Sequence, residues 1–167
     1  MSSGRATSRA RAGSPASVEQ GFTLIEIMIV AAMVVVLAAI SIPFITAGRK
    51  AANEASAISS VRLLHGAMQT CLSTGTCAGF FADMDPLVQQ GLIDKTLGSG
   101  SKSGYEFKVS HQDSSPSFYI YARPQTWGLG YAGTRRFGCD EGGVVKASYS
   151  NIGSYFNANT LAAAPSL

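Results

Sequence analysis

The sequence predicts an α+β protein in which a long N-terminal helix packs on a small antiparallel β-sheet. An apolar run from Phe22 to Ile45 contains a single charged residue, Glu26. An amphipathic pattern follows over residues 46–73, and short segments of alternating apolar and polar residues occupy much of the second half. A long helix followed by a run of strands is typical of the α+β class.

Composition separates this chain from an ordinary soluble domain. It has 167 residues, of which 46% are hydrophobic and 14% are charged, whereas soluble domains carry about 25% charged residues. The net charge is +3, and three arginines among the first 20 residues supply much of it. Because the remainder is nearly neutral and has no stripe of Lys and Arg, no specific nucleic-acid site is expected. The length favours one modest folding unit.

Residues 1–21 have the composition of a targeting leader. They are rich in Ser, Ala, Gly and Arg and contain no apolar run, so they are too polar to build a core. A secretory signal peptide is cut after its apolar region, but here the small residue, Gly21, stands before that region. The sequence therefore predicts a leader that ends at Gly21.

The apolar run of residues 22–45 is long enough to cross a membrane. At about 1.5 Å per residue, a helix of this length reaches roughly 36 Å, more than the ~30 Å hydrocarbon core of a bilayer. Pro43 lies near its end. A proline inside a helix removes one backbone hydrogen bond, so a kink is expected there.

The segment GFTLIEIMIVAAMVVVLAAISIPF closely resembles the N-terminal motif of type IV pilins and type II secretion pseudopilins. The matching features are Gly21, Phe22, Glu26, the uninterrupted apolar helix and Pro43. The resemblance implies that a prepilin peptidase cleaves after Gly21 and N-methylates the exposed Phe22. It also implies that Glu26 acts in subunit assembly and that the apolar helix packs in a filament core.

Physical chemistry supports the role of Glu26 independently. A carboxylate in an apolar environment costs a few kcal/mol unless it finds a partner. Cleavage after Gly21 creates a positive amine on Phe22, one helical turn from Glu26, in the same chain or a neighbouring one. In the family the pairing is between subunits and sets the axial register. The alternative is a signal-anchor helix whose glutamate is protonated or reaches the interface.

Beyond the apolar run, residues 46–73 predict an amphipathic continuation of the helix that ends at residues 73–76. A short helix is expected from Pro86 to about Lys95, with Asp85 as its N-cap. Asp140 to Gly143 predicts a tight turn that joins two strands into a hairpin. The four expected strands span residues 105–109, 118–122, 135–139 and 144–148.

Glycines and aromatic residues of these strands weakly resemble the C-terminal sheet of bacterial pilin-like proteins. The resemblance implies a globular, pilin-like head over residues 74–167. Residues 149–167 contain no Asp, Glu, Lys or Arg. We expect them to form a loosely ordered polar tail at the surface.

The three cysteines predict one structural disulfide and one free thiol. Cys71 and Cys77 flank the predicted helix end and are close enough to close a small loop, and Cys139 is the rival partner of Cys77. The expected role is to staple a small head that lies in an oxidising compartment.

No catalytic, metal or cofactor site is expected. His65 and His111 make no ligand spacing with the cysteines. Gly128 to Gly133 has the spacing of a dinucleotide-binding turn, but a strand and not a helix is predicted after it. The chain is therefore not expected to be an enzyme.

The resemblance predicts a structural subunit of a type IV pilus-like filament. Its expected partners are a prepilin peptidase, copies of itself and other pilin-like subunits, and an inner-membrane assembly platform. The expected location is the bacterial inner membrane, single-pass with a periplasmic head, and then the filament. One alternative is a minor pilin or pseudopilin that primes or tips the filament. Another is a membrane-tethered periplasmic binding module. Motility, adhesion, DNA uptake and secretion roles stay open.

Overall fold

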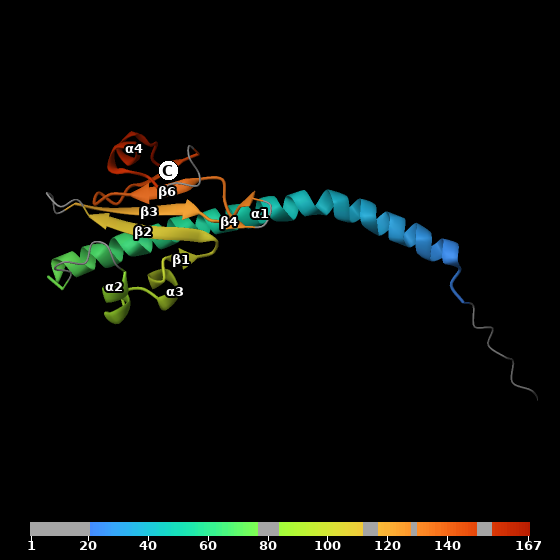
Figure 1. The fold of residues 1–167 in the computed structure, drawn as a ribbon, viewed down its shortest axis with the longest axis horizontal. Coiled ribbons are helices and arrows are strands. Elements are labelled where there is room, and N and C mark those ends of the chain that lie inside the picture. The colour runs from blue at the N-terminus through green and yellow to red at the C-terminus, as the bar shows by residue number, and fades with distance from the viewer. Residues whose placement is uncertain (1–20, 77–83, 112–116, 128–129, 150–154) are drawn as a thin grey trace, which may run out of the picture. The chain divides into compact units, whose positions relative to one another are not determined.

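A computed structural model describes residues 21–76, 84–111, 117–127, 130–149 and 155–167. The chain divides into two compact units, Met1–Ile40 and Ser41–Leu167. Helix α1 (Leu24–Ser73) begins in the first unit and ends in the second. The other helices and strands belong to the second unit (Figure 1).

Helix α1 is continuous over the two stretches in which the sequence predicts helix. It runs through Pro43, where the kink stays a prediction, and it ends at Ser73. Gly75 follows with φ of +68°, a left-handed conformation that glycine adopts without steric cost and that commonly terminates helices. The predicted end of the helix is therefore confirmed.

The second unit contains a five-stranded antiparallel sheet in the order β1-β2-β3-β6-β7. The four predicted strands are confirmed, with boundaries shifted by up to two residues. A separate two-stranded ribbon joins β4 (Thr126–Trp127) to β5 (Gly130–Tyr131). The strands of the main sheet are β1 (Ser101–Lys102), β2 (Tyr105–His111), β3 (Phe118–Pro124), β6 (Arg136–Cys139) and β7 (Val145–Ser148).

The main core lies between the second half of α1 and one face of this sheet (Figure 1). The buried residues of α1 recur every three or four positions, which confirms the predicted amphipathic pattern. They join large side chains of the strands in one cluster, and each side chain buried there contributes about 1.5–3 kcal/mol. Members of the cluster include Val61, Leu64, Met68, Phe107, Phe118, Ile120 and Phe137.

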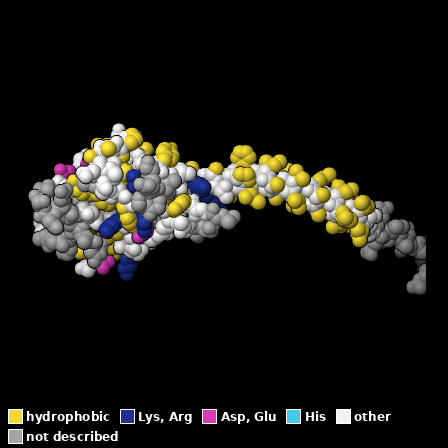
Figure 2. Space-filling model, turned by 45° about the horizontal axis from the view of Figure 1, so that its top comes forward, with side chains coloured by type: hydrophobic (Ala, Val, Ile, Leu, Met, Phe, Trp, Pro, Cys, Tyr) yellow, Lys and Arg dark blue, Asp and Glu magenta, His cyan; other side chains and the backbone are white. Residues whose placement is uncertain are grey.

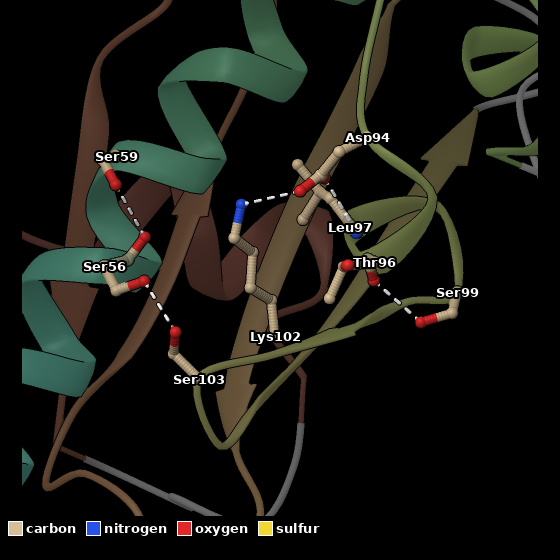
Figure 3. Close-up of polar contacts among 8 residues, drawn as sticks. All are labelled: Ser56, Ser59, Asp94, Thr96, Leu97, Ser99, Lys102 and Ser103. Atoms are coloured by element: carbon tan, nitrogen blue, oxygen red, sulfur yellow. Dashed lines mark hydrogen bonds and ion pairs between the residues drawn. The ribbon is translucent and has the colours of Figure 1, made fainter.

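Strand β1 and the turn after it make polar contacts with α1 and with the loop residue Asp94 (Figure 3). The Ser56 hydroxyl on α1 lies 2.9 Å from the Ser103 hydroxyl. Lys102 forms an ion pair with Asp94, with 3.3 Å between Nζ and Oδ2. The hydroxyl contact joins this edge of the sheet to α1, and the ion pair joins it to Asp94.

The single helix predicted from Pro86 to Lys95 is wrong in two respects. The structure has two short helices, α2 (Asp85–Gln89) and α3 (Lys95–Gly98). Gly91, with φ of +70°, separates them. Asp85 is the first residue of α2 and not its N-cap, whereas Asp94 caps α3 by accepting a 3.0 Å hydrogen bond from the Leu97 amide.

The expectation of a loosely ordered tail is also wrong for residues 155–167. They include helix α4 (Ala158–Ala163), which Asn157 and Thr160 start with a reciprocal capping box. Phe156 and Leu161 are buried with Tyr121 on the sheet face opposite α1. Low charge indicated a polar tail, but two well-placed apolar side chains and a helix cap suffice to dock it.

Gly138 makes this docking possible. A Cβ atom on Gly138 would lie 2.6 Å from Leu161 Cδ1 and 3.0 Å from Phe156 Cδ2. We therefore expect Gly138→Val to lower the free energy of unfolding by about 1–3 kcal/mol, as overpacking does, measured by thermal denaturation. Gly130→Val is the matched control because no atom lies within 4 Å of its Cβ position. Equal midpoints for the two variants would contradict the assigned packing.

Candidate functional site

The first half of α1 has an apolar surface on all sides. Within the described residues, no residue of its most hydrophobic stretch is buried. Figure 2 shows hydrophobic side chains along the visible face of the helix. A helix that is apolar all round belongs inside a membrane or a protein assembly. Its large side chains are 50–78% exposed: Phe22, Leu24, Ile25, Ile27, Met28, Ile29, Val30, Met33, Val34, Val35, Val36, Leu37, Ile40, Ile42, Phe44 and Ile45. We call this surface the apolar half of α1.

The apolar half of α1 also has the dimensions of a membrane span. Among the described helices, α1 is the one that is long and apolar enough to cross a membrane, judged by length and composition. From Leu24 to Ile45 the helix extends about 33 Å, which matches a ~30 Å hydrocarbon core.

The start of α1 places Gly21, Phe22 and Glu26 at an exposed end. Gly21 and Phe22 precede the helix, and all three residues are exposed. Thr23 caps the helix, since its hydroxyl accepts a 3.3 Å hydrogen bond from the Glu26 amide. Glu26 thus lies one turn beyond Phe22 and forms no ion pair with a described residue. Cleavage after Gly21 stays a prediction, and Gly21 and Phe22 on either side of that bond are exposed.

A second acidic side chain, Glu54, fastens α1 to the loop that precedes β6. Glu54 is 6% exposed. Its Oε1 accepts hydrogen bonds from the amide and hydroxyl of Thr134 and from the amide of Arg135. Its Oε2 forms an ion pair with the Arg135 guanidinium at 2.8 Å. We call Glu54, Thr134 and Arg135 the Glu54 clamp.

The environment of Glu54 favours its charged form. Burial acts to raise the pKa of the carboxyl, but the hydrogen bonds from Thr134 and Arg135 and the Arg135 charge outweigh it. The pKa of Glu54 is therefore lowered. Burial raises the pKa of the neighbouring Tyr105 hydroxyl, which donates a 2.7 Å hydrogen bond to the Arg135 carbonyl.

A third contact holds α1 near its C-terminal end. His65 Nε2 lies 3.1 Å from the Glu141 carbonyl oxygen, and Gln69 Nε2 donates to the same oxygen at 3.2 Å. Glu141 belongs to the predicted turn, which is confirmed by a 3.1 Å hydrogen bond from Gly143 N to Asp140 O. The half-buried His65 thus positions the β6–β7 hairpin.

The cysteines separate into bonded and free forms. Cys71 is disulfide-bonded, whereas Cys139 carries a buried free thiol. The alternative pairing of Cys77 with Cys139 is therefore wrong, because Cys139 is enclosed in β6 among core side chains. Cys77 lies outside the described residues, so the Cys71–Cys77 pairing stays a prediction. Burial raises the pKa of the Cys139 thiol to about 11.

Within the described part of the chain, no three His, Cys, Asp or Glu side chains gather closely enough to hold a metal ion. No protein-family model, curated protein or solved structure matches this chain.

Sequence reasoning did not identify Thr23 or Glu54. The spacing of Thr23 and Glu26 is that of a capping box, S/T-x-x-E, which signals a helix start. Glu54 precedes Ala57 and Val61 at helical spacing on the buried face of α1. An acid in such a position predicts a partner from another element, but the sequence does not reveal that the partner is Arg135.

Removing the Glu54 carboxylate should destabilise the second unit. Glu54→Ala leaves the Thr134 amide and the partly exposed Arg135 guanidinium without their acceptor, so we expect a loss of about 2 kcal/mol at pH 7. A lowered folded-state pKa contributes stability above the ordinary value of about 4.3. That contribution disappears as the pH falls through the folded-state pKa.

Chemical denaturation of both proteins between pH 7 and pH 3 measures this difference. The difference in free energy of unfolding between wild type and Glu54→Ala should decrease as the pH falls. Glu141→Ala is the control, because Glu141 bonds through its backbone carbonyl and keeps that contact. A gap independent of pH would contradict a stabilising charged carboxylate.

Proposed function

We propose that this protein is a structural subunit of a type IV pilus-like filament, cut after Gly21 and polymerised through the apolar half of α1. The observation that carries the proposal is an exposed helix, apolar on all sides, that begins directly after Gly21 and Phe22 and contains one acid, Glu26. The sequence resemblance supports the same reading. No described residue covers this surface, which suits a helix that packs in a membrane or among neighbouring copies.

Two environments can cover the apolar half of α1 in succession. A membrane covers it before assembly, and equivalent helices of neighbouring copies cover it afterwards. Both environments bury side chains that contribute about 1.5–3 kcal/mol each relative to water. Transfer from lipid to a bundle of identical helices therefore leaves the burial intact, so assembly and disassembly require little net hydrophobic energy.

Glu26 is the group that distinguishes one axial position from another. In an apolar environment its charge needs a partner, and the sequence contains no basic residue between Glu26 and Arg49. The amine that cleavage would create on Phe22 of a neighbouring copy supplies one. Four residues of helix rise about 6 Å, so this pairing offsets adjacent copies along the axis by about that distance.

The second unit supports the same role by holding its part of α1 firmly. The Glu54 clamp, the Ser56–Ser103 contact and the His65 and Gln69 contacts connect that helix to three different loops. These contacts join the second half of α1 and the sheet into one compact unit, which can be carried as a whole by the apolar half of α1. The proposed partners are a prepilin peptidase, other pilin-like subunits and an inner-membrane assembly platform.

Intact mass tests processing and location together. The proposal predicts a mass that corresponds to Phe22–Leu167 plus one methyl group, abundant in sheared surface filaments. The same mass confined to membranes would favour a minor pilin or a pseudopilin. An uncut chain in cells with an active prepilin peptidase would contradict the proposal and favour a membrane-tethered binding module.

Substitutions at Glu26 distinguish two roles of its side chain, which are setting the axial register between copies and capping the start of α1. Both Glu26→Ala and Glu26→Gln should reduce filaments about tenfold or more, because each removes the charge that pairs with the Phe22 amine. Sheared filaments are quantified by immunoblot and electron microscopy. Glutamine still serves at the third position of a capping box. Normal assembly of Glu26→Gln would show that the side chain acts only in capping.

Thr23→Ala is the matched control. It removes the capping hydroxyl, at a cost of about 1 kcal/mol to the helix start, and leaves the charge of Glu26 in place. Filaments should form in this variant. Membrane levels of every variant are compared so that reduced assembly is distinguished from degradation.

A further inference from the structure

The outer edge of β7 is covered by the last three residues of the chain. Lys146 and Ser166 form an antiparallel bridge. The Ala147 amide donates to the Pro165 carbonyl at 3.1 Å, and the Leu167 amide donates to the Val145 carbonyl at 3.0 Å. Pro165–Leu167, which we call the edge segment, therefore satisfies backbone groups of the last strand of the sheet.

The pairing on β7 has a geometry that a second copy can reproduce. In the bridge, residues 146 and 166 face each other, and the two hydrogen bonds flank them. If Val145–Ala147 of a second copy replaces the edge segment, the bonds become Ala147 N to Val145 O in both directions. The two copies are then related by a two-fold axis through Lys146.

We propose that the β7 edge is a latent interaction surface for a second copy of this chain, and that the edge segment closes it. An uncovered edge strand presents unpaired N–H and C=O groups that pair readily with another strand. Because backbone groups alternate along a strand, only Ser166 directs its N–H and C=O away from β7. This inference does not depend on the filament proposal.

Lys146 provides a second barrier against the same pairing. In the two-fold arrangement Lys146 lies directly opposite Lys146 of the other copy, and like charges in that position are destabilising. In the free chain its Nζ donates instead to the Ala162 carbonyl at 3.2 Å. The edge segment and the charge of Lys146 thus both oppose pairing of β7 with β7 of a second copy.

A cysteine at the symmetry axis tests the proposal in the full chain, purified in detergent. Residues opposite each other in a non-hydrogen-bonded antiparallel pair have Cα atoms about 4.5 Å apart, within the range that a disulfide spans. Lys146→Cys is introduced into the complete chain and into a chain that ends at Ala164. The shorter chain keeps α4 and the buried Phe156 and Leu161. The same chains without the new cysteine report any reaction of Cys139.

Under mild oxidation, the chain that ends at Ala164 should form about tenfold more cross-linked dimer than the complete chain, because its edge is open. The matched control replaces Pro165, Ser166 and Leu167 with alanine. It keeps the backbone strand and should behave as the complete chain does. Leu167→Pro removes the bond to Val145 without shortening the chain and should raise the dimer fraction, even if the shortened chain fails to fold.

Equal cross-linking in the complete chain, the shortened chain and Leu167→Pro would overturn the proposal. If the triple-alanine chain cross-links as much as the shortened chain, the backbone of residues 165–167 does not protect the β7 edge, and the proposal is also overturned. Folding of each variant is followed by circular dichroism. Filament formation is measured separately, so a failure of this inference is distinguishable from a failure of the proposed function.

Discussion

One helix that meets two environments is the constraint on which the structure depends. The first half of α1 exposes large apolar side chains on every side, whereas the second half buries one face against the sheet. Burial of one half of a helix does not bury the side chains of the other half. Each half therefore needs its own packing partner. The second half has one within the chain, in the core around Val61, Leu64 and Met68. The first half has no such cover among the described residues, and it is long and apolar enough to cross a membrane.

The second unit is also stabilised where side chains pack closely on the backbone of the sheet. Gly138 lets Leu161 and Phe156 cover the face of the sheet opposite α1. The Arg136 guanidinium lies 4.2 Å from the centre of the Phe156 ring, which adds a cation–π contact. The sheet is therefore covered on both faces and on its β7 edge. The cover on β7 protects that edge of the sheet from uncontrolled strand pairing.

Hydrophobic periodicity predicted the features that depend on local pattern. The helix over residues 22–73 and the four long strands were predictable because burial on one face imposes a repeat of 3.6 or 2 residues. The Asp140–Gly143 turn followed from its glycines. Docking of residues 155–167 was not predictable, because it depends on a glycine in β6 and an aromatic residue far away in sequence. The partner of Glu54 was hidden for the same reason.

The two acidic residues on α1 stand in opposite environments, since Glu54 is buried and Glu26 is exposed. Two amides, a hydroxyl and a guanidinium of the same chain bind the Glu54 carboxylate. Its charge therefore stabilises the fold of the second unit. Glu26 forms no ion pair with any described residue and lies within the exposed apolar half of α1. In the proposed filament, a group from another copy compensates this charge. In the proposed filament, cleavage after Gly21 would create an amine one helical turn from Glu26, so the proposal couples processing to assembly.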